Sequence, residues 1–160
     1  MGKAPEALDD YLVAQRVVVL FVAERAHQLA GALLVGERLA VLERKVGEDF
    51  LHSQPVAVIA ALDGVALAAA RHAIDSGYDR GWLRVEKIFA YLPFEHSESL
   101  DDQERACDLM RPLGDEQYDY ALRHKAIIER FGRFPHRNAV LGRESTPEEI
   151  EFLKQPGSGF

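Results

Sequence analysis

The feature that most constrains the fold is the scarcity of strand signals in a chain rich in helix-forming residues. The sequence contains no Asn-Gly turn and no run in which β-branched and polar residues alternate. Ala, Leu, Glu and Arg fill the stretches between its glycine and proline residues. The sequence therefore predicts an all-α fold, with helices over residues 5–31, 37–50, 55–76, 80–92, 98–111, 115–131 and 146–155.

The ends of several predicted helices coincide with residues that favour the start or the end of a helix. Glycines occupy three expected C-terminal cap positions: Gly77, Gly114 and Gly132. The last helix has the clearest start, with Thr146 as the N-cap and Pro147 as the first helical residue. Glu149 follows three residues after Thr146 and completes a capping box.

Helices 98–111 and 115–131 are predicted to form an antiparallel hairpin, because only a short Pro-Leu-Gly connection joins them. Apolar residues share one face of each helix: Leu100, Cys107 and Met110 in the first, and Tyr120, Ile127, Ile128 and Phe131 in the second. His124 lies within the second stripe, so we interpret it as a buried histidine, with a catalytic role as the alternative. From Glu98 to Phe131 the hairpin spans 34 residues, the period of tetratricopeptide repeats.

Length and composition limit the classes of protein that this chain can belong to. Its 160 residues fit a single domain over residues 1–160, and its net charge of -7 argues against binding nucleic acid or anionic membranes. The apolar stretches 17–36 and 55–70 carry charged residues, so we predict core-facing helices rather than membrane spans. The single cysteine, Cys107, is interpreted as a core residue rather than a nucleophile. With no possible intrachain disulfide and no secretory signal, we expect a cytoplasmic protein.

Positive charge is concentrated in one segment of this acidic chain. Residues 123–143 contain six cations and one acid, so the segment carries +5 and the rest of the chain -12. Five of the six cations are arginine, whose planar guanidinium suits carboxylate or phosphate groups. The densest part is the motif RFGRFPHRN, residues 130–138, which is predicted to leave its helix as a loop. Its arginines either bind a ligand or partner, or form ion pairs within the protein.

A second polar cluster is YLPFEHSES, residues 91–99. Pro93 is expected to break the preceding helix, and Ser97 to cap the next one. Glu95, His96 and Glu98 would then lie at a helix entrance, where a histidine beside carboxylates can exchange a proton near neutral pH. Three roles remain open for this cluster: capping and packing, acid–base chemistry, and metal binding together with His124 and His136.

The common catalytic and nucleotide-binding motifs do not occur in the sequence. It contains no HExxH or cysteine pair for a metal, no GxSxG nucleophile motif, and no P-loop or GxGxxG. The sequence therefore predicts no cofactor and no dedicated metal site.

Two long stretches make the chain recognisable: FAYLPFEHSESLDDQ, residues 89–103, and HKAIIERFGRFPHRNAVLGRESTPEEIEFL, residues 124–153. Over residues 63–160 the chain resembles the bacterial family known as domain of unknown function 924. The resemblance implies an all-α, tetratricopeptide-like array of antiparallel helical hairpins and no established activity. The family pattern falls on Pro93, Glu95, His96, Glu98, Gln103, His124, Arg130, Phe131, Gly132, Arg133, Pro135, His136, Arg137, Asn138, Arg143, Thr146 and Glu149.

The N-terminal part departs from this family. Members usually carry a tryptophan-bearing first helix and an LDQFxRNxxR-like motif just before the helix that starts near Asp63. This chain has GEDFLHSQPVAVIAALDG in that place, and residues 25–60 are atypical for the family.

Two functional hypotheses follow from the two polar clusters. The first is a binding module whose pocket takes a small anionic molecule or an acidic peptide. Its expected ligand-binding residues are Glu95, His96, Glu98, His124, Arg130, Arg133, His136, Arg137, Asn138 and Arg143. The second is a small enzyme in which His96 or His136 acts as acid or base, with Glu98 as a further candidate, on a phosphate- or carboxylate-bearing substrate.

Overall fold

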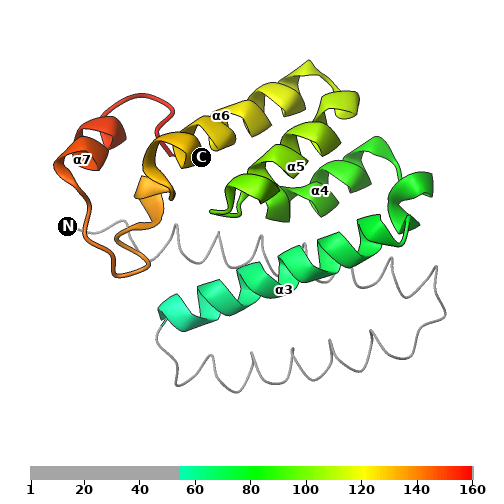
Figure 1. Ribbon diagram of the computed structural model, residues 1–160, viewed down its shortest axis with the longest axis horizontal. Helices are drawn as coiled ribbons and strands as arrows, with labels where there is room; N and C mark the ends of the chain where they lie inside the picture. The colour runs from blue at the N-terminus through cyan, green and yellow to red at the C-terminus, as the bar shows by residue number, and fades with distance from the viewer. Residues whose placement is uncertain (1–54, 160) are drawn as a thin grey trace. The chain divides into compact units, whose positions relative to one another are not determined.

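The computed structural model of the chain describes residues 55–159, and this part is helical throughout, with no strand. Five α-helices and three short 3-10 helices follow one another (Figure 1): α3 (Pro55–Asp75), η1 (Tyr78–Gly81), α4 (Arg84–Glu95), α5 (Leu100–Met110), η2 (Arg111–Leu113), α6 (Asp115–Phe131), η3 (Pro135–Arg137) and α7 (Pro147–Leu153). The all-α prediction is confirmed for these residues. The predicted helices 5–31 and 37–50 lie outside them.

The chain divides into two compact units between Phe94 and Glu95, and each is described by itself. In the first unit, α3 buries three alanines spaced four and three residues apart, Ala66, Ala70 and Ala73, so they share one face. No helix within residues 55–159 is long and apolar enough to cross a membrane, as expected for the stretch 55–70. The stretch 17–36 falls outside the described residues.

Helix α4 is joined to α3 by the turn at η1. Its start is closed by Glu86, whose Oε2 accepts a hydrogen bond of 2.8 Å from the backbone N–H of Leu83. Trp82, Tyr91 and Phe94 are buried, and the guanidinium of Arg71 in α3 lies 5.6 Å from the centre of the Phe94 ring. The apolar side of α4 thus forms part of the core of this unit.

Pro93 does not break α4, contrary to the expectation from the sequence. The helix continues for two residues beyond it and ends at Glu95. A proline inside a helix removes one backbone donor and crowds the carbonyl group four residues earlier, and α4 ends two residues after Pro93.

The second unit is built on the hairpin of α5 and α6. The three residues of η2 join the two helices, which pack against each other as the antiparallel pair predicted for them (Figure 1). Both stripes are buried over most of their length: Ala106, Cys107 and Met110 in α5, and Ala121, His124, Ile127 and Ile128 in α6. The predicted burial of Cys107 and His124 is therefore confirmed.

Two members of the predicted apolar stripes are not buried. Leu100 is 44% exposed and Tyr120 is 47% exposed. Helical spacing places a residue on a face, but burial also requires another element to cover that part of the face. The start of α5 differs too, because its N-cap is Ser99 rather than Ser97. Ser97 instead accepts a hydrogen bond of 3.2 Å from the backbone N–H of Ser99 and donates one of 2.8 Å to Asp102.

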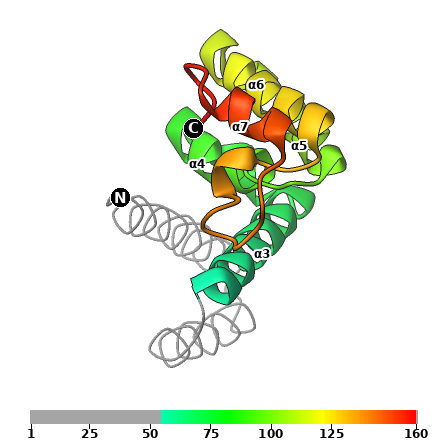
Figure 2. The ribbon, with the colours of Figure 1, turned by 90° about the vertical axis from the view of Figure 1, so that its left-hand side faces the viewer.

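Helix α7 packs beside the C-terminal end of α6 (Figure 2). The ring centroids of Phe131 and Phe152 lie 5.0 Å apart, next to buried Ile127 and Ile128. Thr146 forms the predicted capping box with Glu149, and Gly132 is the predicted C-terminal cap of α6, with φ of 67°. The chain between these two caps returns along the hairpin and carries most of the RFGRFPHRN motif.

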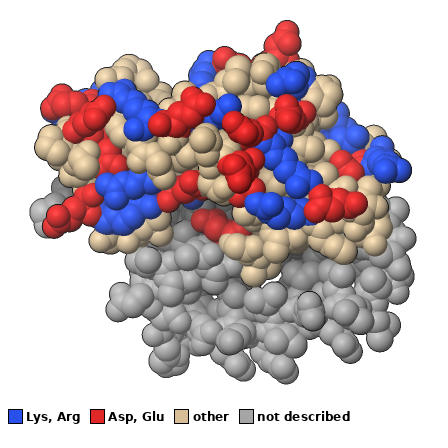
Figure 3. Space-filling model, in the orientation of Figure 1, with Lys and Arg blue, Asp and Glu red and all other residues tan. Residues whose placement is uncertain are grey.

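Basic and acidic side chains are interspersed on the surface of the described residues. On the face shown in Figure 3, Lys and Arg groups lie next to Asp and Glu groups, without a broad area of one sign. The positive segment of the sequence is therefore not a uniform positive surface on this face.

Candidate functional site

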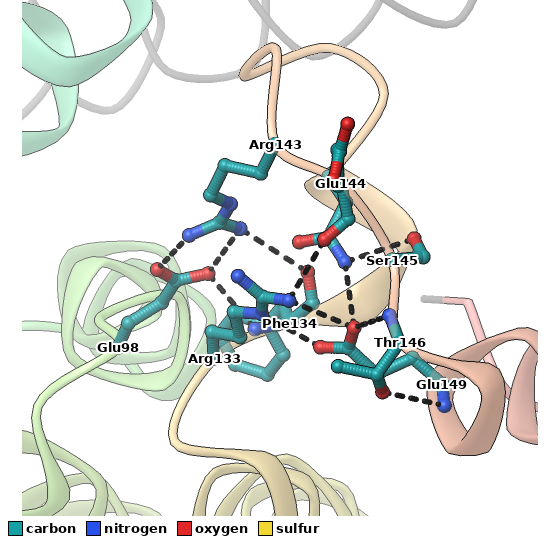
Figure 4. A network of polar contacts seen from close by, with 9 residues as sticks. Glu98, Arg133, Phe134, Arg143, Glu144, Ser145, Thr146 and Glu149 are labelled. Atoms are coloured by element: carbon teal, nitrogen blue, oxygen red, sulfur yellow. Dashed lines mark hydrogen bonds and ion pairs between the residues drawn. The ribbon is translucent and has the colours of Figure 1, made fainter.

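The two polar clusters of the sequence meet in the second unit. Glu98 lies just before α5, and its carboxylate accepts a hydrogen bond of 2.8 Å from the backbone N–H of Phe134. Arg143 donates two more hydrogen bonds to it, one of 2.7 Å from NH1 and one of 2.9 Å from NH2 (Figure 4). Arg137 donates from NH1 to the backbone carbonyl oxygen of His96, at 3.0 Å. Segments that lie 36 to 45 residues apart in the sequence are thus joined directly.

Local backbone geometry delivers Arg143 to Glu98. After Gly132 the chain turns, and Pro135 starts the short helix η3. The backbone N–H of Arg143 then bonds to the carbonyl oxygen of Asn138 at 2.7 Å, which closes a compact turn around Gly142, with φ of 62°. Glycine adopts this left-handed conformation at little cost, so it allows the chain to fold back here.

A second carboxylate, that of Glu149, holds the other side of the same loop. Arg133 donates to it from Nε at 2.6 Å and from NH2 at 2.8 Å, and a third bond of 3.0 Å runs from NH2 to the carbonyl oxygen of Glu144. The amide of Asn138 and the backbone N–H of Thr146 also donate to Glu149, at 3.2 Å and 2.7 Å. Glu149 is 2% exposed, so four donors satisfy a buried carboxylate (Figure 4).

The hydrogen bonds of both carboxylates favour their charged forms. The Arg133 guanidinium, followed by the backbone N–H of Thr146, lowers the pKa of Glu149 to about 2. Burial alone would raise the pKa of Glu98, but the hydrogen bonds from Arg143 and from the backbone of Phe134 outweigh burial and lower it. Both groups are therefore charged at neutral pH.

The pairing of the arginines differs from the pairing expected from the sequence. Because both motifs lie at the ends of consecutive helices, the sequence predicts that Arg130, Arg133 and Arg137 pair partly with Glu95 and Glu98 and partly face a cavity. Instead, Arg130 pairs with exposed Glu148 at 2.8 Å, and Arg133 pairs with Glu149. The ion pair of Glu98 is made by Arg143. The alternative of internal ion pairing therefore describes Arg130, Arg133 and Arg143.

Three histidines lie close together beside Phe134: His124 and His136 contact its ring, and His96 contacts His124. We call His96, His124 and His136 the histidine cluster. The ring of His124 lies 5.7 Å from that of Phe134 and 5.8 Å from that of His96, and the rings of Phe134 and His136 are 5.7 Å apart. The guanidinium of Arg137 lies 5.2 Å from the centre of the Phe134 ring. The structure thus brings together residues that the sequence places in three separate segments.

The histidine cluster is uncharged at neutral pH. Burial lowers the pKa of His96 to about 3, and the charge of Arg137 adds to the effect. The same two causes lower the pKa of His136 to about 4, and burial also lowers the pKa of His124. Neutral imidazoles act as hydrogen-bond donors and acceptors, so the cluster offers polar contacts rather than positive charge.

Glu95 differs from the other two glutamates of this unit's network because no cation shifts its pKa. Its side chain is 4% exposed, and burial raises its pKa to about 7. Its Oε1 atom has no hydrogen-bond partner among the residues that the structure describes. A buried carboxyl group of this kind holds its proton up to neutral pH.

Two residues that the sequence analysis did not assign to a site hold the site together. Gln103 is fully buried, and its Nε2 donates to the carbonyl oxygens of Glu95 and Ser97, both at 2.6 Å. Glu149 was expected only to cap α7, yet it also binds Arg133. The family pattern contained both residues, but spacing along the sequence did not indicate these contacts.

Metal binding was one of the roles left open for the cluster around His96. Within residues 55–159, no three side chains of the metal-binding types His, Cys, Asp and Glu are close enough to hold an ion. We therefore build no metal site from these residues.

Comparisons with known proteins identify the family of this chain. A search of the curated proteins found no match. One solved structure that matches is that of a protein of unknown function, ATU0120, from Agrobacterium tumefaciens. It is 35% identical with a TM-score of 0.60, over 94% of this chain and 74% of the other. The model of the family described as bacterial protein of unknown function (DUF924) matches residues 54–157, and the chain belongs to this family.

Proposed function

We propose that this protein is a binding module that takes a small anionic molecule at the histidine cluster. One observation carries the proposal: His124 and His136 lie against Phe134, His96 lies against His124, and Arg137 lies against the Phe134 ring. Polar rings gathered within a core contribute little to stability, because burying them costs hydration. Such groups are typical of sites where a ligand replaces the lost water contacts.

Two features favour an anionic ligand. Arg137 supplies a permanent positive charge beside the cluster. The Nδ1 atom of His136 is buried and has no hydrogen-bond partner within residues 55–159, so it can donate to or accept from a ligand. Arg137 also donates to the backbone carbonyl oxygen of His96, which holds its guanidinium beside the imidazoles, so recognition would rest on Arg137 and the imidazoles.

A titration followed by NMR tests this proposal directly. We expect phosphate, sulfate or acetate at about millimolar concentration to shift the imidazole resonances of His96, His124 and His136. Exposed His72, which belongs to the other unit, serves as an internal control and should not move. Arg137→Gln should weaken the effect about tenfold or more, whereas Arg123→Gln, on the exposed side of α6, should not. Equal shifts at His72 would show nonspecific binding, and no shifts at any histidine would refute the proposal.

A second candidate function, acid–base catalysis, is favoured by Glu95 rather than by the histidines. The lowered pKa values of His96 and His136 make both rings weak bases. Glu95 has a pKa of about 7, which suits proton transfer near neutral pH. A screen with p-nitrophenyl acetate and p-nitrophenyl phosphate would test this function. Turnover with an apparent pKa near 7 that is lost in Glu95→Gln would support it, and turnover that survives the substitution would exclude Glu95.

We also propose how the helices are arranged and where in the cell the protein is located. The α5–α6 hairpin, which runs from Leu100 to Phe131 within the 34-residue stretch that starts at Glu98, supports a tetratricopeptide-like array of hairpins, a scaffold commonly used for binding. The single buried cysteine supports a cytoplasmic protein. Small-angle scattering and fractionation of cells that express the tagged protein would test these two points.

A further inference from the structure

We infer that Glu98 is an autoinhibitory latch: its carboxylate occupies an anion cradle on the loop and so holds the loop over the histidine cluster. We call residues 132–145 the strap, and we call the two N–H groups of Arg143 together with the N–H of Phe134 the cradle. A carboxylate of the ligand would displace Glu98 from the cradle and release the strap. The role assigned to the ligand rests on the proposed function, whereas the latch itself does not.

The strap carries His136 and covers His124 directly. Phe134 is 1% exposed, and its ring packs edge-on against that of His124, which is itself 4% exposed. Pro135, the next residue, is fully buried as well. Movement of this part of the strap would therefore uncover the side of the His124 ring that Phe134 covers.

The cradle has the geometry of a carboxylate site. Arg143 forms two roughly parallel bonds to the two oxygens of Glu98, and the N–H of Phe134 donates to one of them (Figure 4). Such a bidentate pattern matches a planar carboxylate better than a tetrahedral phosphate or sulfate. Glu98 thus stands where the carboxylate of a ligand would bind.

The two attachments of the strap are not equivalent. Glu149 belongs to α7, which directly follows the strap, so its bonds to Arg133 and Asn138 tie the strap to its own continuation. Glu98 belongs to the turn before α5, and its bonds to Phe134 and Arg143 tie the strap to the histidine cluster. Losing this one carboxylate removes three hydrogen bonds, whereas the Glu149 attachment and the single bond from Arg137 to the carbonyl oxygen of His96 remain.

The ends of the strap can act as hinges. Gly132 and Gly142 both have left-handed backbones, with φ of 67° and 62°. Nothing lies within 4 Å of the place where a Cβ atom would stand on either glycine. The space beside both glycines is therefore open, and glycine allows a wide range of backbone angles.

Chemical rescue tests the latch without knowledge of the natural ligand. In Glu98→Ala the cradle is empty, so we expect diethyl pyrocarbonate to modify His124 about 10- to 100-fold faster than in the unaltered protein. Modification of exposed His72 calibrates the reagent. Added acetate should refill the cradle and slow the modification of His124, and sulfate should do so less well.

Two further variants make the test specific. Arg143→Gln should also speed modification of His124, but acetate should not reverse it, because the cradle is lost; this variant also serves if Glu98→Ala does not fold. Glu148→Ala removes a carboxylate that binds exposed Arg130 by two hydrogen bonds, and it should change neither the rate nor the acetate response. Amide hydrogen exchange in α6 should stay slow in all three variants.

Three results would overturn the inference. The first is an unchanged rate at His124 in both Glu98→Ala and Arg143→Gln. The second is a faster rate in Glu98→Ala that acetate does not alter, which would show a structural ion pair and no anion site. The third is loss of amide protection throughout α5 and α6, which would show that Glu98 supports the whole unit. A different combination separates the two proposals. If acetate slows the modification of His124 in Glu98→Ala but the unaltered protein shows no imidazole shifts in the NMR titration, the latch is supported and the proposed function is refuted.

Discussion

Arg133 and Glu149 form a two-pronged ion pair across the strap, with Nε to Oε1 at 2.6 Å and NH2 to Oε2 at 2.8 Å. The carboxylate is 2% exposed, and the arginine also donates to the carbonyl oxygen of Glu144. Arg133, the second arginine of the RFGRFPHRN motif, therefore connects the end of α6 to the start of α7.

This ion pair predicts a large loss of stability in Arg133→Ala. The substitution leaves the Glu149 carboxylate buried without its cation, which is more costly than the loss of an exposed pair. Arg133→Lys should recover only part of the loss, because an ammonium group cannot form two parallel bonds. Thermal unfolding followed by circular dichroism measures both effects. Arg123→Ala is the control, because Arg123 pairs with Asp119 on the exposed side of α6 and its loss should hardly change Tm.

Removal of the N-cap of α7 should have a smaller effect. Thr146 Oγ1 accepts from the backbone N–H of Glu149 at 3.2 Å, and Thr146→Ala leaves that donor without its partner. We expect the free energy of unfolding to fall by about 1 kcal/mol. Urea unfolding of Thr146→Ser should match the unaltered protein, since serine caps equally well. An equal loss in both variants would point to a role for the threonine methyl group instead.

Glu95→Gln should stabilise the protein at alkaline pH. The pKa of Glu95 is raised to about 7 in the folded protein, against about 4.5 for the free group. Between these values the folded state holds a proton that the unfolded state has released, so stability falls as pH rises. The variant lacks this loss and should be more stable by on the order of 3 kcal/mol at pH 8, with little difference at pH 4.

Urea unfolding at pH 4, 6 and 8 measures this dependence. The control is Glu104→Gln, which changes an exposed glutamate on α5 and should show no comparable gain at pH 8. A decline in stability between pH 5 and 8 that is the same in Glu95→Gln and the unaltered protein would contradict the assignment.

The histidine cluster should lower the stability of the folded protein as the pH falls, whereas Glu95 lowers it as the pH rises. The pKa of His136 is lowered to about 4, so between about pH 6.5 and 4 the unfolded state takes up a proton before the folded state does. Stability contributed by the neutral ring is therefore present above pH 6.5 and is lost as pH falls. NMR should show His136 neutral down to about pH 4, and His136→Gln should be less sensitive to acid than His72→Gln. An imidazole of His136 that titrates near pH 6.5 would contradict the buried, uncharged ring.

Much of the helical framework could be predicted because its signals are local. The start of α7 follows from Thr146, Pro147 and Glu149, since a capping box needs only residues within one turn. The burial of His124 follows from its place in an apolar stripe. The meeting of the two polar clusters follows from the short connection between α5 and α6, which brings distant ends of the chain together.

The details of the site could not be predicted, because they depend on where side chains end in space. Several arginines of similar reach compete for several glutamates, and composition does not decide that Arg143 rather than Arg133 reaches Glu98. Glu95 is buried and its Oε1 has no hydrogen-bond partner within residues 55–159, but in the sequence it looks like any other charged residue near a helix end. Gln103 donates to two backbone carbonyl groups before α5, and the spacing of residues in the sequence does not predict these bonds either.

The distance in sequence between Glu98 and its partners sets an order of events during synthesis. Glu98 leaves the ribosome well before Phe134 and Arg143, which follow 36 and 45 residues later. The α5–α6 hairpin has mostly local contacts and can form first. The strap can bind Glu98 only after Arg143 has been synthesised. Until then His124 lacks the cover that Phe134 provides, so the nascent protein passes through a stage in which its histidines are open to solvent.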